Sequence, residues 1–178
     1  VVVLEKKKTV FNLIGFECDE GVRRNNGRVG ASHAPIAVKS KLANLPCHFP
    51  RSTEVFDVGN VRCTDDQLEE AQAELGQVVR RSLEKKGTPI IIGGGHETLY
   101  GHYLGVRQYL GETASLGIIN IDAHFDMRPY DEGPSSGTMF RQILDQDKYS
   151  HYLCVGIQKH GNTRFLFNEA EKYGCQYI

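Results

Sequence analysis

Two short segments place ionisable side chains directly after apolar runs. Residues 93–97 read GGGHE and follow the run PIII at 89–92, and residues 122–126 read DAHFD and follow the run LGIINI at 116–121. Both runs are expected to be strands of a parallel sheet, in which functional groups gather at the carboxyl ends of the strands. These two segments are therefore the first candidates for chemistry.

Alternate residues of the second segment are ionisable, at Asp122, His124 and Asp126. If the strand stays extended past its apolar run, all three side chains point to one face. Such a group is costly to bring together without a partner, and a divalent cation is the simplest one. His96 is expected at the same edge of the sheet, because the glycines before it allow a sharp turn.

The predicted ligand set is His96, Asp122, His124 and Asp126. Two carboxylates and two imidazoles without a thiolate favour manganese, with iron or zinc as substitutes, over a structural zinc site. Four ligands are enough for one ion with an open position, whereas a pair of neighbouring ions needs further bridging carboxylates. The alternative interpretation of the DAHFD segment is a solvated turn.

The order of elements predicts an α/β fold. Strands are expected at 9–15, 55–58, 89–92, 116–121, 152–156 and 175–178, and helices at 35–44, 64–87, 98–110, 138–144 and 162–173, with a loop at 16–33. Thr64 and Gln67 are expected to form a capping box at the start of the second helix. The alternation indicates a three-layer α-β-α domain over residues 1–178 with a mainly parallel sheet. Uninterrupted apolar strands favour burial on both faces.

Composition excludes several classes of partner. The net charge is −1, so no basic excess attracts nucleic acid or an acidic membrane surface. No apolar run approaches the roughly 20 residues that span a bilayer. Five cysteines at wide spacing fit reduced thiols better than a disulfide framework or a zinc knuckle, which favours the cytoplasm. The triple glycine lacks the GxGxxG and GK[ST] patterns of nucleotide sites.

The GGGHE and DAHFD segments resemble the first two metal motifs of the ureohydrolases, the superfamily of arginase, agmatinase and formimidoylglutamase. The resemblance runs from about Leu13 to the end of the chain. It implies an arginase-like fold and a hydrolase with two manganese ions. Carried over by position, His96 and Asp126 would bind the first ion, His124 the second, and Asp122 would bridge both.

Three further stretches resemble the formimidoylglutamase branch, namely 19–28 (DEGVRRNNGR), 135–142 (SSGTMFRQ) and 156–158 (GIQ), as does GGGHE in place of GGDHS. That branch implies hydrolysis of a small molecule, N-formimidoyl-L-glutamate, to L-glutamate and formamide during histidine degradation. Metal-activated water would attack the amidine carbon. Asp126 would hydrogen-bond the nucleophile or the departing amine, so it is also the predicted catalytic residue.

The two carboxylates of that substrate call for guanidinium partners. Arg128 lies two residues past Asp126, and Arg141 stands where arginases have a histidine, so both are predicted to bind substrate. Ser136 and Gly137 are expected to add hydroxyl and backbone contacts. One of three further cations is expected to contribute, without a choice among Arg23, Arg24 and Arg28.

The superfamily also has a third motif, Asp-x-Asp on a later strand, and the sequence reaches Ile178 without it. The resemblance places the later strands between the strand before His96 and the strand before Asp122. We therefore expect a fold that is incomplete at the C-terminus, with two unpaired apolar edges and low stability in isolation. The rival functions are another amidine or guanidine hydrolase, acting on arginine, agmatine or a guanidino acid, and a catalytically inactive ureohydrolase-like binding protein. A homo-oligomer is compatible with the family.

Overall fold

The computed structural model describes residues 8–178. Its strands are β1 (Thr9–Glu17), β2 (Thr53–Arg62), β3 (Thr88–Ile92), β4 (Leu116–Ile121), β5 (Ser150–Val155) and β6 (Gln176–Tyr177). Its helices are α1 (Glu20–Arg24), α2 (Ala34–Leu42), α3 (Leu68–Glu84), α4 (Thr98–Leu110), α5 (Met139–Gln146) and α6 (Arg164–Lys172), with short 3₁₀ turns at Ala31–His33 and Lys159–Gly161. Strands and helices alternate as the sequence predicts, so the chain is an α/β protein.

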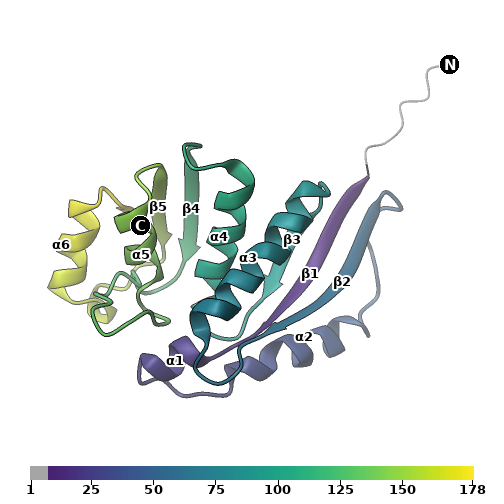
Figure 1. Cartoon of the computed structure of the whole chain (residues 1–178), viewed down its shortest axis with the longest axis horizontal. Coiled ribbons are helices and arrows are strands. Elements are labelled where there is room, and N and C mark those ends of the chain that lie inside the picture. Colours follow the sequence, from purple (N-terminus) through teal and green to yellow (C-terminus); the bar gives the residue numbers. More distant parts are fainter. Residues whose placement is uncertain (1–7) are drawn as a thin grey trace.

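The strands form two parallel three-stranded sheets, with orders β2-β1-β3 and β4-β5-β6. In Figure 1 the five labelled strands, β1 to β5, point toward the same end of the molecule, where α1 lies. β3 and β4 are edge strands that do not pair with each other. The family resemblance predicts that later strands lie between these two edges, and the separation of β3 from β4 agrees with it. Which segment pairs with the two edges stays a prediction.

The first sheet lies between helices on both faces. Ile14 and Phe16 of β1 pack in one cluster with Leu75 of α3. The intervening Gly15 faces the other way, where an ideal Cβ would lie 3.1 Å from Pro35 Cβ in α2. Because successive residues of a strand point to opposite faces, α3 and α2 cover opposite sides. The predicted three-layer arrangement is confirmed for this half of the molecule.

Among residues 8–178, the second sheet is covered on one face and exposed on the other. Its core cluster contains Phe125, Met127, Met139, Phe140, Tyr152, Cys154, Leu166 and Ala170. The rings of Phe140 and Tyr152 stack at 4.0 Å between centroids. On the opposite face of β4, Ile119 is 69% exposed and Ile121 is 84% exposed. The expectation that this apolar strand is buried on both faces is therefore wrong for the described residues.

Helix α3 begins later than the sequence predicts. Its first residue is Leu68, and no side chain caps its N-terminus. The carbonyl of Thr64 instead accepts the Gln67 N–H in a turn, in which Asp65 has a φ of 52°. A left-handed residue at that point interrupts a right-handed helix, so the predicted capping box is wrong.

The predicted loop at 16–33 is also wrong in part. β1 continues to Glu17 because it pairs with β2 and β3 on its two sides. The five-residue helix α1 follows, and its Glu20 forms ion pairs with Arg23 and Arg24 at i+3 and i+4, a spacing that stabilises helices. In contrast, α4 and β4 have the predicted bounds. Among the described helices, none has both the length and the apolarity to cross a bilayer.

Candidate metal and substrate site

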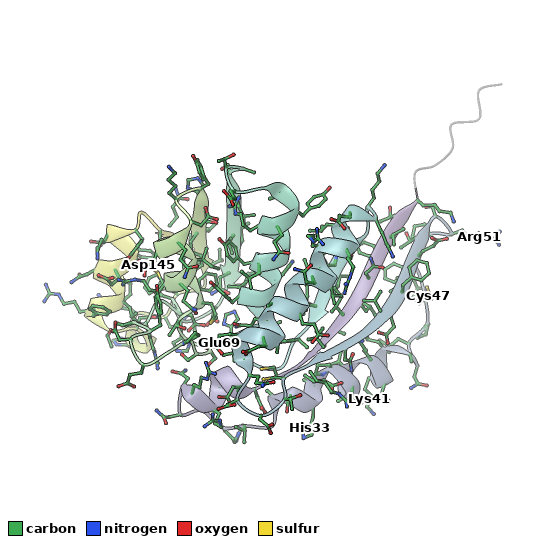
Figure 2. The ribbon with its side chains drawn as sticks, viewed as in Figure 1. His33, Lys41, Cys47, Arg51, Glu69 and Asp145 are labelled. Atoms are coloured by element: carbon green, nitrogen blue, oxygen red, sulfur yellow. The ribbon has the colours of Figure 1, made fainter. Side chains whose placement is uncertain are left out.

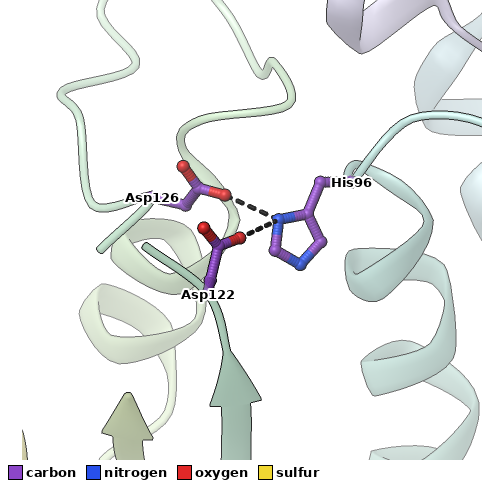
Figure 3. Close-up of side chains that lie close together, drawn as sticks. All are labelled: His96, Asp122 and Asp126. Carbon is purple, nitrogen blue, oxygen red and sulfur yellow. Dashed lines mark hydrogen bonds and ion pairs between the residues drawn. The ribbon is translucent and has the colours of Figure 1, made fainter. Parts of the chain in front are cut away.

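Three predicted ligands meet where the edges of the two sheets face each other. His96 Nδ1 lies 2.7 Å from Asp126 Oδ2 and 3.3 Å from Asp122 Oδ2 (Figure 3). One ligand atom from each residue lies within 4.8 Å of the others. His96 belongs to the loop after β3, and both aspartates belong to the loop after β4. The cluster is thus assembled from segments that are far apart in the sequence.

A turn, rather than an extended strand, brings the two aspartates together. β4 ends before Asp122, whose Oδ1 accepts the backbone N–H of His124 at 2.9 Å. Asp126 has a φ of 48°, a left-handed conformation that is uncommon outside glycine and concentrates at functional sites. Its neighbours Phe125 and Met127 are fully buried and hold this part of the backbone. The prediction that alternation along a strand aligns the ligands is therefore wrong.

His124 lies outside the three-residue cluster but next to one of its members, Asp122. Its side chain is 55% exposed, and its Nδ1 lies 3.4 Å from Asp122 Oδ1. The ring lies toward Gly161, where an ideal Cβ would be 3.2 Å from His124 Nε2. The three-residue cluster does not include it. Its role as a metal ligand stays a prediction.

The charges around His96 fit a site for a cation. Burial by itself lowers the pKa of His96, but the hydrogen bond with Asp126 and the charges of Asp126 and Asp122 outweigh burial, so the net pKa is raised. The two carboxylates beside Nδ1 thus favour the protonated form of the imidazole. A divalent ion on the same three groups would replace that proton, and this mixture of nitrogen and oxygen ligands suits manganese.

The loop after β3 is fixed by buried polar contacts. The Gly95 N–H donates to the Cys18 carbonyl at 2.9 Å, and Gln72 Nε2 donates to the Glu97 carbonyl at 2.9 Å. The Glu97 side chain is fully buried, and that burial raises the pKa of its carboxyl. His96 lies between these anchored residues, so its backbone position is well defined.

Three predicted substrate-binding residues gather beside α1. Arg128 is exposed; its Nη1 donates to Asn25 Oδ1 at 2.7 Å, and its backbone N–H donates to the Gly137 carbonyl at 3.0 Å. The Ser136 N–H donates to the Gly21 carbonyl at 3.0 Å. Sequence reasoning missed Asn25, although it lies in the 19–28 stretch that indicated the branch.

Arg141 forms ion pairs with carboxylates of α5 and α6 instead of lying beside α1. Its Nε donates to Asp145 Oδ2 at 3.0 Å, its Nη1 forms an ion pair with Glu169, and its guanidinium lies over the Tyr173 ring at 4.7 Å. Figure 2 shows Asp145 on the side of the molecule that α5 and α6 form. The cation therefore joins α5 to α6, and the structure does not bring it into the three-residue cluster. This arrangement does not support the predicted substrate contact.

Two of the three remaining arginines also form ion pairs with carboxylates. Arg23 pairs with Glu20 at 2.5 Å, and Arg24 pairs with Glu20 at 2.9 Å and with Glu69 at 2.7 Å. Figure 2 labels Glu69 near α1. Arg28 is exposed and forms no ion pair within residues 8–178. Of the three, Arg28 alone keeps a charge that is free of a carboxylate in that range.

Comparisons with known proteins agree on one family. Residues 10–178 match the Arginase family model. The formimidoylglutamase of Geobacillus thermodenitrificans is 63% identical over 165 residues, which are 93% of this chain and 51% of that protein. The formimidoylglutamase of Geobacillus sp. WCH70 is 61% identical over 171 residues, 96% of this chain and 53% of that protein. The chain thus spans about half the length of these curated relatives.

A solved structure gives the same result for the fold. The Trypanosoma cruzi formiminoglutamase, described with Mn²⁺, superposes with a TM-score of 0.82 at 25% identity, covering 98% of this chain and 62% of that one. The expected arginase-like fold is therefore confirmed. Family model, relatives and structure agree, and the chain belongs to the arginase family.

Proposed function

We propose that this chain carries the metal-binding portion of a formimidoylglutamase, which hydrolyses N-formimidoyl-L-glutamate to L-glutamate and formamide. The observation that carries the proposal is the convergence of His96, Asp122 and Asp126 within 4.8 Å. Relatives named formimidoylglutamase, up to 63% identical, support the choice of substrate. A small molecule is the proposed partner, and the five free thiols are compatible with the cytoplasm as its location.

The proposed cofactor is a pair of manganese ions. His96 and Asp126 would hold one, His124 would hold the other, and Asp122 would contribute to both. The Mn²⁺ named with the Trypanosoma cruzi structure supports the choice of metal. When bound, manganese supplies acidified water as the nucleophile for hydrolysis.

In the reaction, a C–O bond forms at the formimidoyl carbon and the bond from that carbon to the glutamate nitrogen breaks. A proton from water must reach the departing nitrogen. Asp126 is the proposed carrier, because its carboxylate lies in the cluster with His96 and Asp122, next to the place where the water would be held. A carboxylate in this position takes up the proton and returns it to the amine.

Arg128 is the proposed partner of a substrate carboxylate. One of its N–H groups is bound to Asn25, and a guanidinium has five, so donors remain for the substrate. Gly137 uses its backbone to hold Arg128 and Ser135, because its carbonyl accepts the Arg128 N–H and its N–H donates to Ser135 Oγ. Gly137 thus acts through Arg128. Ser136 offers its hydroxyl to the substrate.

The test uses the natural protein that contains this sequence, loaded with Mn²⁺ and supplied with N-formimidoyl-L-glutamate, arginine or agmatine. We expect glutamate release from the first substrate alone, with loss of activity after chelation or in Asp122→Ala. Glu112→Ala, an exposed carboxylate outside the cluster, is the matched control. Urea release from arginine or agmatine would replace this proposal with the guanidine-hydrolase alternative. Mn²⁺ binding without any turnover would favour the inactive binding protein.

A second comparison tests the choice between the two arginines. Arg128→Met removes the free cation and is expected to raise KM about tenfold, which is the loss of about 1.4 kcal/mol of binding. Arg141→Met breaks the ion pair that joins α5 to α6 and leaves Lys172, 3.7 Å away, as the cation beside Glu169. It is expected to lower stability by about 2 kcal/mol with little change in KM. A KM effect confined to Arg141→Met would reverse the assignment.

A further inference from the structure

Glu97 follows the ligand His96 and has an unusual environment. Its side chain is fully buried, and its Oε1 accepts the Gly21 N–H at 3.1 Å and the Cys18 thiol at 3.7 Å. Its Oε2 has no hydrogen-bond partner among the described residues. A buried carboxyl oxygen without a hydrogen-bond partner destabilises the fold, and the hydrogen bond from Gly21 to the other oxygen offsets part of that cost. The contact with Gly21 is therefore the feature to explain.

Gly21 connects the two halves of the candidate site. Its N–H donates to Glu97 in the loop after β3, while its carbonyl accepts the Ser136 N–H from the segment before α5. Asn25 at the end of α1 accepts from Arg128 at 2.7 Å. A displacement of α1 would thus move the partners of both proposed substrate contacts at once.

The space around the Glu97 carboxylate is made by two glycines. An ideal Cβ on Gly21 would lie 2.7 Å from Glu97 Cβ, and one on Gly95 would lie 2.0 Å from Glu97 Oε2. Both distances are far below van der Waals contact. The carboxylate therefore fills the space between the loop after β3 and α1, and it has no room to shift without moving one of them.

We propose that Glu97 is a positioning residue that fixes α1 and, through Gly21 and Asn25, aligns Ser136 and Arg128 with the metal-binding residues. The inference rests on the proposed function for its substrate readout, but its structural readout does not. Loss of the carboxylate leaves the buried Gly21 N–H without an acceptor and frees α1 to move. Misplacement of a binding group by about 1 Å is enough to change rates strongly.

The structural test is hydrogen exchange of the backbone amides in residues 19–26 and 134–139. In Glu97→Ala, both segments are expected to exchange at least tenfold faster than in the wild type. Glu97→Gln keeps an oxygen for the Gly21 N–H and is expected to preserve protection. Glu69→Ala removes an exposed carboxylate that also contacts α1, so it is the matched control. Unchanged exchange at 134–139 in Glu97→Ala would overturn the proposal, whatever the substrate.

The kinetic test separates substrate alignment from metal binding. With Mn²⁺ and N-formimidoyl-L-glutamate, Glu97→Ala is expected to raise KM about tenfold while Mn²⁺ affinity, measured by calorimetry, stays within about twofold. Glu97→Gln should restore KM. A loss of Mn²⁺ affinity with unchanged KM would show that Glu97 serves the metal loop alone. An inactive wild type would refute the proposed function but leave the exchange result valid.

Asn25→Ala covers the case in which Glu97→Ala does not fold. It breaks the same series of contacts at the far end, next to Arg128, without opening the buried space around Glu97. KM should rise in Asn25→Ala, and combining it with Glu97→Gln should add nothing further. An unchanged KM in Asn25→Ala would contradict the series of contacts, because Arg128 would then be placed independently of α1.

Discussion

After β3, residues 93–97 lead into α4 through three glycines, whereas after β4 residues 122–138 pass before α5 begins. The first loop is anchored by polar contacts, with Glu97 buried against Gly21. The second is anchored by apolar side chains, with Phe125 and Met127 buried on either side of Asp126. Both deliver ligands to one cluster. The comparison shows two ways to orient a metal ligand. In the loop after β3, glycines make room for a buried polar side chain; in the loop after β4, large apolar side chains hold a residue in a left-handed conformation.

The largest expected effect comes from removing an apolar anchor of the second loop. The Phe125 ring meets Phe167 and Tyr177 edge-on at 5.1 and 5.2 Å between centroids. Phe125→Ala is expected to lower the free energy of unfolding by about 3–5 kcal/mol, because a buried aromatic ring leaves a cavity. Chemical denaturation measures this. A loss below about 1 kcal/mol would mean that the second loop is not held by its apolar side chains.

Asp126→Asn separates the charge of the second loop from its strain. Asparagine tolerates the left-handed conformation that Asp126 has, so the backbone should persist. Without the charge, Mn²⁺ affinity is expected to fall about a hundredfold, at the upper end of what groups around a metal contribute. Isothermal titration with Mn²⁺ gives the affinity, and circular dichroism checks the fold. Wild-type affinity in this variant would remove Asp126 from the proposed ligands.

The first loop should be most sensitive to a side chain where glycine now stands. An ideal Cβ at Gly95 would lie 2.0 Å from Glu97 Oε2, so Gly95→Asp brings two carboxylates into one space. Overpacking of this kind costs about 1–3 kcal/mol. The double substitution Gly95→Asp with Glu97→Ser should recover at least half of that loss in denaturation experiments. If the double variant is no more stable than Gly95→Asp, the two positions do not compete for space.

The smallest expected effect is a pH dependence of Mn²⁺ affinity, which arises because His96 of the first loop contacts Asp122 and Asp126 of the second. The pKa of His96 is raised by Asp126 and Asp122, so its protonated form stabilises the metal-free protein below about pH 6.5, and this stabilisation is lost as the pH rises through the raised value. Mn²⁺ must displace the same proton. Below the raised pKa, Mn²⁺ affinity should fall by up to about tenfold per pH unit.

Titrations with Mn²⁺ across that range measure this dependence. His96→Gln is the control, because the variant lacks the titrating group. If the wild type and His96→Gln have the same pH profile, the proton that Mn²⁺ displaces does not come from His96.

Elements with strong local signals were predictable. α4 and β4 have the predicted bounds because helical spacing and an uninterrupted apolar run are read directly from the sequence. α1 was not, because five residues are too few to show a period, and its stability comes from Glu20, Arg23 and Arg24. β2 is longer than predicted because pairing with β1 extends it to Arg62.

For the site, residue types were predictable and orientations were not. The turn after β4 leaves His124 outside the three-residue cluster, although its Nδ1 lies 3.4 Å from Asp122 Oδ1, and alternation along a strand cannot show such a turn. One ion pair of Arg141 could be predicted from the sequence, because Asp145 stands at i+4 on the same helix. The other could not, because Glu169 is distant in the sequence and meets Arg141 only in the folded chain. Asn25 has no signal of its own in a single sequence.

The division of the cluster between the ends of β3 and β4 has a thermodynamic consequence. His96 and Asp122 stand on opposite sides of that division, each attached to the end of an edge strand of a different sheet. A cation that binds both residues binds only when the two sheets are docked, so docking and cation binding are linked equilibria. At a free concentration 100 times its Kd, such an ion adds about 2.7 kcal/mol to the docked state. By the same linkage, any change that loosens the contact between the sheets weakens the affinity for the ion.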